Sequence, residues 1–174
     1  VRFLGEDTAK GIDQYYSKFV SSEHNRIIYQ KDKDAELINF KLKTKHQPLD
    51  EFVYRLDRLD DLVMEFALRI KEEYKSPFIY ITIVDKENRS IGILQRSNGL
   101  GDENIEEREN GYLKYLLDVS IPRITLSRGL YSISLTITEG YRSVPLLRVQ
   151  SVCSFQVYSE AEVWPPIEFE GNWS

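Results

Sequence analysis

The stretch Leu62-Val63-Met64-Glu65-Phe66-Ala67-Leu68-Arg69-Ile70 decides the fold class of this chain. Its large apolar side chains fall at every second position. Met, Leu and Ala favour helices, so a helix is the competing interpretation. Strict alternation is typical of a strand with one buried face. We therefore predict a strand here, with Glu65 and Arg69 on its outward face.

The same alternation recurs on both sides of this stretch and predicts further strands. With it, the predicted strands are 37–42, 62–70, 78–84, 90–96, 112–121, 129–137 and 149–158. Polar residues 85–89 form a turn that makes a hairpin, and 97–110 is a polar, acidic loop. Strands separated by turns without helices between them predict an all-β fold. We expect an antiparallel β-sandwich of seven or eight strands, jelly-roll or immunoglobulin-like.

The first 34 residues have a different pattern. Apolar residues recur at helical spacing between Ile12 and Val20, and Asp7 or Thr8 can cap a helix that begins near Ala9. Residues 21–34 are polar and predict a linker. The predicted organisation is a short N-terminal helix with a linker over 1–34, followed by the sandwich over 35–174.

Composition limits the function. The chain has 174 residues, 41% of them apolar, and a formal net charge of −5. This is the balance of one globular domain, and no apolar run approaches the roughly 18 residues that cross a membrane. Lys41, Lys43 and Lys45 alternate, which is typical of a solvated edge strand. Without a basic cluster, a nucleic-acid partner is not expected.

Catalytic motifs are missing from the sequence. It contains no GxxxxGK[ST], HExxH or GxSxG, so we predict no enzymatic activity. His24 and His46 stand apart without metal-site spacing, and no metal ligand is predicted. Cys153 lies within an apolar alternation and is interpreted as a core residue. A reducing compartment is consistent with a single cysteine.

Three aspartates, Asp57, Asp60 and Asp61, lie together before the strand 62–70. Glycosidases use paired carboxylates, and calcium takes several oxygen ligands. A turn before a strand is also where solvated acids ordinarily lie. The solvated turn is the favoured interpretation and an ion site is its alternative.

Several segments resemble one known family. Residues 76–85 followed by Ser90-Ile91-Gly92 are similar to a P-F-x-I-x-I-x-D…G core. Residues 126–135 look like an L-x-x-G-x-Y-x-I strand, and residues 153–157 resemble an a-x-F-x-V strand. These motifs belong to the C-terminal carbohydrate-binding domain of Wzt-type ATP-binding proteins of O-antigen polysaccharide ABC transporters. Residues 5–16 are similar to the end of a transporter ATPase domain.

The resemblance implies a noncatalytic role. The domain would bind the nonreducing end, often capped, of a lipid-linked O-antigen polysaccharide and recruit it to the transporter. It implies a homodimer with exchanged C-terminal strands, a permease partner, and a place at the cytoplasmic face of the inner membrane. ATP and Mg would belong to the ATPase domain, so no cofactor is expected here. The alternative is a dimerisation or assembly domain that binds no sugar.

Parity along the predicted strands gives candidate binding residues. Side chains that face outward would provide aromatic surface and hydroxyl or amide groups for a sugar if their strands share one sheet; ordinary solvent-facing sheet is the alternative. These candidates are Tyr80, Thr82, Arg69, Ser134, Gln156 and Tyr158. Arg69, Arg96 or Arg148 would suit an anionic cap.

The C-terminal tail is predicted to form the dimer interface. Trp is enriched in interfaces, and stacking of Trp164 or Trp173 on sugar is the alternative. The interface candidates are Trp164, Ile167, Phe169 and Trp173.

Overall fold

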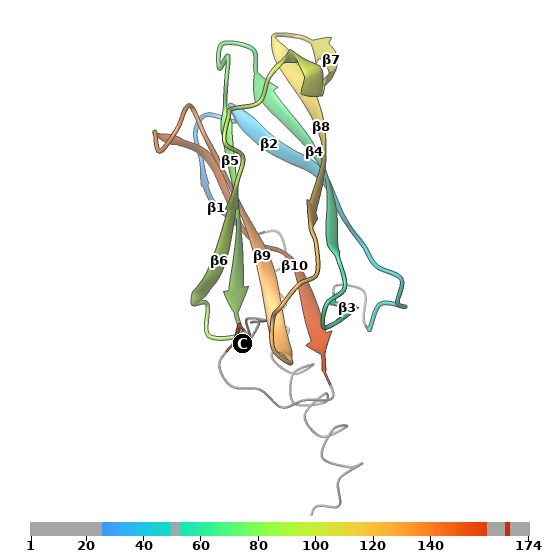
Figure 1. Cartoon of the computed structure of the whole chain (residues 1–174). Coiled ribbons are helices and arrows are strands. Elements are labelled where there is room, and N and C mark those ends of the chain that lie inside the picture. Colours follow the sequence, from blue (N-terminus) through green and yellow to red (C-terminus); the bar gives the residue numbers. More distant parts are fainter. Residues whose placement is uncertain (1–25, 50–52, 160–165, 168–174) are drawn as a thin grey trace, which may run out of the picture.

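The computed structural model describes residues 26–49, 53–159 and 166–167, which form two packed β-sheets (Figure 1). The strands are β1 (Arg26–Gln30), β2 (Ala35–Lys43), β3 (Val53–Asp57), β4 (Leu62–Lys71), β5 (Phe78–Asp85), β6 (Ser90–Gln95), β7 (Ile105–Glu109), β8 (Tyr112–Ile121), β9 (Gly129–Thr138) and β10 (Pro145–Tyr158). Sheet A has the order β1-β10-β9-β5-β6, with β3 also paired to β10. Sheet B has the order β2-β4-β8-β7.

The core lies between the sheets and confirms the predicted sandwich. On β4, every second side chain from Leu62 to Ile70 is at most 2% exposed, as the alternation predicts for a strand. The predicted inward residues of β5, Ile79, Ile81 and Ile83, belong to the same buried cluster. Lys41 and Lys43 lie on β2, which is an edge strand of sheet B as expected.

Strand β10 connects most of sheet A. One of its edges pairs along its length with β9, and the other is divided between β1 and β3. Its register shifts between Val149 and Cys153, where Ser151 has a positive φ of 52°. The bulge therefore separates the part that pairs antiparallel with β1 from the part that pairs parallel with β3.

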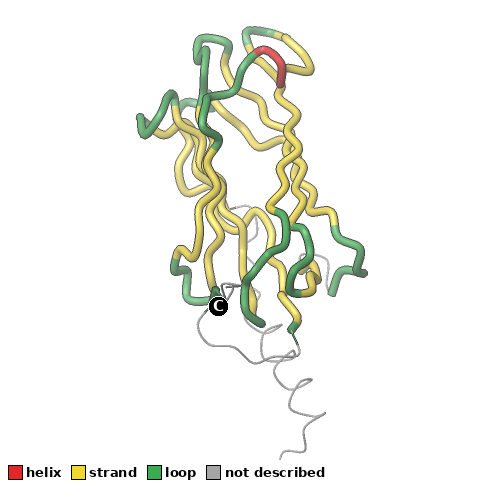
Figure 2. Tube along the Cα trace, in the orientation of Figure 1, coloured by secondary structure: helices red, strands yellow, loops and turns green. Residues whose placement is uncertain are grey.

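Three strands lie where the sequence analysis did not expect them. Residues 26–30, expected within a linker, form β1, and 105–109, expected in a loop, form β7 after a 3-10 turn over Asp102–Asn104 (Figure 2). The third, β3, has a parallel partner, so the sandwich is not wholly antiparallel. Edge strands β1 and β7 are almost entirely exposed, so their sequences lack the apolar alternation that marks a half-buried strand.

Some predictions fall outside the described residues: the N-terminal helix, and the interface residues Trp164, Phe169 and Trp173. Ile167 is described and forms an isolated antiparallel bridge with Leu126. No helix in the described part of the chain is long and apolar enough to cross a bilayer.

A buried carboxylate, Asp34, lies in the turn between β1 and β2 and contacts the turn between β4 and β5. Its side chain is 4% exposed and forms an ion pair with Lys71. The Tyr74 hydroxyl donates to Asp34 Oδ2 over 2.5 Å, and the Lys31 ammonium lies 5.4 Å from the Tyr74 ring and 2.6 Å from Glu139. Hydrogen bonding from Lys71 and Tyr74 lowers the pKa of Asp34.

We expect Asp34→Asn to lower the free energy of unfolding by about 2 kcal/mol at pH 7, because the charge-assisted bond to Lys71 is lost while Lys71 itself is partly exposed to solvent. Since the folded state lowers the pKa of Asp34, its contribution is present above the unfolded pKa of about 4 and is lost as pH falls through the folded pKa. Urea unfolding between pH 7 and pH 3 measures both effects. The matched control is Asp32→Asn in the same turn, where Asp32 is exposed; an equal loss in both variants would contradict the role of Asp34.

Cys153 is confirmed as a core residue, at 4% exposure, and burial raises the pKa of its thiol. Because the thiolate is the reactive form, we expect the native protein to react with a disulfide reagent only through unfolding. Labelling rates followed across urea concentrations test this. A fast, urea-independent rate would show that the thiol is accessible in the native state.

Candidate functional site

Five of the six predicted sugar-binding residues lie on sheet A. On the face away from the core, Thr82 of β5 is paired with Ser134 of β9. Tyr80 lies on β5, and Gln156 and Tyr158 lie on β10. The five residues therefore share one face of sheet A, but they do not form one group: Tyr80 lies opposite Thr136, and Gln156 lies opposite Leu130, six residues away along β9.

Several of these side chains are engaged or buried. Tyr80 is 9% exposed, and its hydroxyl accepts a hydrogen bond of 2.8 Å from the backbone N–H of Arg142. Gln156 is 3% exposed. The Arg55 guanidinium lies 4.4 Å from the centre of the Tyr158 ring and covers that ring with a cation. Fewer of the predicted binding residues are therefore accessible to a ligand than strand parity alone indicates.

Arg69 does not share this sheet. It lies on β4, which pairs with β2 and β8 in sheet B. Its guanidinium donates to Glu36 over 2.6 Å and lies 4.9 Å from the Tyr112 ring centre. The prediction that Arg69 shares one sheet with the other candidates is therefore wrong. Alternation does not specify which strands β4 pairs with, and its pairing places Arg69 in sheet B.

The structure reveals a cleft between the sheets that the sequence analysis missed. It has a volume of about 390 Å³ and opens between β6 and β8. The apolar lining residues are Ile79, Ile81, Leu94, Leu100, Leu117 and Val119. The polar lining residues are Gln95, Arg96, Asn104, Asp118 and Ser120.

Incomplete strand pairing accounts for the opening. Strand β7 pairs with β8 only from Tyr112 to Tyr115, so the edge of β8 beyond Tyr115 faces no partner strand among the described residues. At the rim, Arg96 donates to Asn104 over 2.5 Å and to Glu103 over 2.7 Å. These contacts hold the guanidinium beside an apolar cavity. Such a site suits a ligand with both C–H surface and polar groups.

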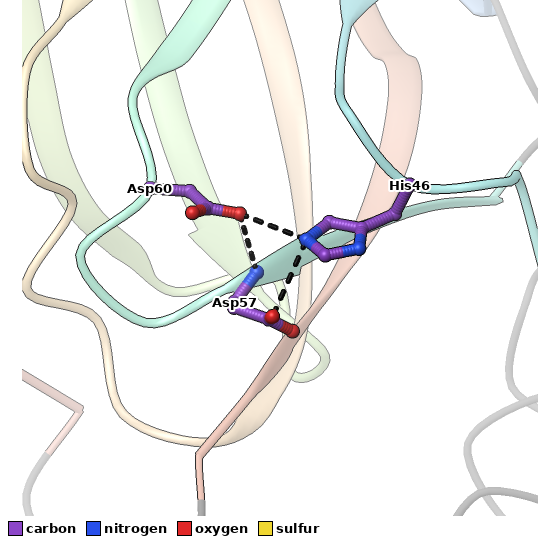
Figure 3. A group of neighbouring side chains, drawn as sticks. All are labelled: His46, Asp57 and Asp60. Carbon is purple, nitrogen blue, oxygen red and sulfur yellow. Dashed lines mark hydrogen bonds and ion pairs between the residues drawn. The ribbon is translucent and has the colours of Figure 1, made fainter.

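A second grouping lies at the end of β3. His46 Nε2 is 3.3 Å from Asp57 Oδ2 and 3.1 Å from Asp60 Oδ2 (Figure 3). The sequence analysis predicted no metal ligand at His46 because no partner lies at metal-site spacing, and the fold places this side chain beside Asp57 at the end of β3 and Asp60 in the turn before β4. Partial burial is the largest single influence on the Asp60 carboxyl and by itself raises its pKa. Hydrogen bonds from Lys45, the Asp57 backbone and His46 together outweigh it, so the pKa of Asp60 is lowered.

The comparisons with known proteins bear on the fold. No family model matches the chain, and no curated relative matches it. Among solved structures, the fold of the chain is already known. One such structure is the C-terminal domain of Wzt, with a TM-score of 0.65 and 14% sequence identity over 91% of this chain and 93% of that chain. The resemblance predicted from the sequence motifs is thus confirmed at the level of the fold.

We expect Tyr80→Phe to lower the free energy of unfolding by about 1 kcal/mol, because the Arg142 N–H loses its acceptor. Chemical denaturation measures the change. Tyr141→Phe is the matched control, since Tyr141 is 55% exposed and should change stability by less than about 0.5 kcal/mol. If Tyr80→Phe left the stability unchanged, the Tyr80 hydroxyl would not be needed for folding and would be available to bind a ligand.

Proposed function

We propose that this chain is a noncatalytic carbohydrate-binding domain that recognises the nonreducing, optionally capped end of a lipid-linked O-antigen polysaccharide and recruits it to an ABC transporter. The observation that carries the proposal is the inter-sheet cleft in a fold shared with the C-terminal domain of Wzt. The proposed partners are the polysaccharide end, a second copy of the chain and a permease, at the cytoplasmic face of the inner membrane.

The lining of the cleft supports recognition of a sugar. Aliphatic walls from β5 and β8 can contact the C–H faces of a pyranose ring. Arg96 and Asn104 at the rim provide donors and acceptors for hydroxyl groups. The cleft volume of about 390 Å³ lies within the range of small-molecule sites, so we infer that it takes one terminal residue rather than a long stretch of polymer.

Binding without hydrolysis agrees with the charges at the cleft. Glycosidases place two carboxyl groups on either side of the scissile bond. Among the described residues that line the cleft, Asp118 is the one carboxylate. We therefore propose that the site retains its ligand and performs no chemistry on it.

An assembly domain without sugar binding is the alternative function. Strand β1 forms an edge of sheet A, and its Ile27, Ile28 and Tyr29 are 55%, 54% and 40% exposed. Exposed apolar residues on an edge strand favour contact with another protein surface. This role needs no ligand in the cleft, so the two functions differ in a direct binding measurement.

We expect Val119→Trp to abolish polysaccharide binding, because Val119 pairs with the buried Met64 and faces the cleft, where an indole would occupy the space of a sugar ring. The matched variant is Ser134→Trp, which places the same side chain on the outward face of sheet A. Calorimetry with purified O-antigen polysaccharides from a panel of strains, each with and without its terminal cap, measures the binding of both variants.

The two variants distinguish the possible sites. Loss in Val119→Trp alone supports the cleft, and loss in Ser134→Trp alone assigns binding to the predicted face of sheet A. Circular dichroism confirms that each variant is folded. If the wild-type chain binds no polysaccharide of the panel and is an oligomer by light scattering, the assembly function is favoured instead.

A further inference from the structure

We propose that His46, Asp57 and Asp60 form a binding site for a divalent transition-metal ion, with Zn²⁺ as its best occupant. The three side chains come from the loop after β2, the end of β3 and the turn before β4, and they converge on one point (Figure 3). The site is separate from the cleft, whose lining residues it does not share.

The distances fit a shared ion. The donor atoms of the three residues all lie within 4.8 Å of one another, and His46 Nε2 is 3.1 and 3.3 Å from the two carboxylate oxygens. Zinc lies about 2.0–2.2 Å from nitrogen and oxygen ligands, which puts neighbouring ligand atoms roughly 3 Å apart. Small side-chain rotations would therefore place all three donors around one ion.

Contacts from outside the group orient both carboxylates. Lys45 Nζ is 2.5 Å from Asp60 Oδ1, and the Arg55 guanidinium is 3.2 Å from Asp57 Oδ1. The remaining oxygen of each carboxylate, Oδ2, faces His46 Nε2. Outer contacts that fix the direction of ligands are typical of metal sites. Here they leave Oδ2 of Asp57 for the ion, together with the second lone pair of Asp60 Oδ2, whose first accepts the Asp57 backbone N–H.

The same contacts indicate which ion is favoured. Lys45 and Arg55 offset the charge of the two aspartates, so an ion that depends on carboxylate charge and many oxygen ligands, such as Ca²⁺, gains little. Zn²⁺ gains from the imidazole nitrogen as well. The His46 side chain is 20% exposed and that of Asp57 is 41% exposed, so water can complete the coordination.

Calorimetry with ZnCl₂ on the chelator-treated, dialysed chain tests the proposal. We expect one equivalent of Zn²⁺ to bind, and CaCl₂ at the same concentration not to compete. His46→Ala and Asp57→Asn should each weaken Zn²⁺ binding at least tenfold. Asp60 is left unchanged because it accepts the Asp57 backbone N–H over 3.0 Å, and its loss would disturb the turn itself.

Matched controls separate this site from ordinary histidine or carboxylate binding. His24→Ala removes the other histidine of the chain, and Asp61→Asn changes an acid of the same turn whose Oδ1 accepts from the Arg123 backbone N–H. Both should bind Zn²⁺ like the wild type. Zn²⁺ should also raise the melting temperature of the wild type and of the controls but not of His46→Ala.

Three results would overturn the proposal. These are the absence of saturable Zn²⁺ binding by the folded wild type, a Zn²⁺ affinity that His46→Ala leaves unchanged, and a loss of binding in His24→Ala. Circular dichroism without metal shows whether each variant is folded. Should His46→Ala not fold, His46→Gln, which retains a polar side chain, takes its place under the same criteria.

Discussion

The pairing of β10 is the constraint on which sheet A depends. This strand has fourteen residues, and it holds β9 on one edge and both β1 and β3 on the other. The bulge near Ser151 allows this division, because it ends one ladder before the next begins. Its inward Cys153, Phe155 and Val157 are each at most 4% exposed. The strand thus supplies both core and connectivity.

Sheet B is assembled differently, and the cleft follows from the difference. Strand β4 is central and pairs along its whole length with β8, whereas β7 covers only the first part of the outer edge of β8. Sheet A ends on the same side with β6, which pairs with β5. Apolar residues that would be sealed in a fully paired sandwich, such as Leu117 and Leu94, therefore line an opening.

Local pattern was sufficient for the fold class and insufficient for the sites. Alternation along β4 shows which of its side chains are buried, but it does not show which strands β4 pairs with. The position of Arg69 in sheet B, and the meeting of His46 with Asp57 and Asp60, depend on which strands pair and how loops return. Edge strands β1 and β7 have little buried surface, so alternation could not reveal them. Family-like motifs indicated the fold, since those motifs follow the buried positions, but they did not give the order of the strands within each sheet.

The proposed metal site and the cleft are connected through the backbone although they share no side chain. The turn that carries Asp60 exchanges two hydrogen bonds with Ile124: Leu59 N–H donates to its carbonyl over 2.9 Å, and its N–H donates to the Asp60 carbonyl over 2.8 Å. Directly beyond that turn, Leu62 of β4 pairs with Ile121 at the end of β8, next to Ser120 at the cleft rim. An ion that fixed the turn would therefore also restrict the end of β8.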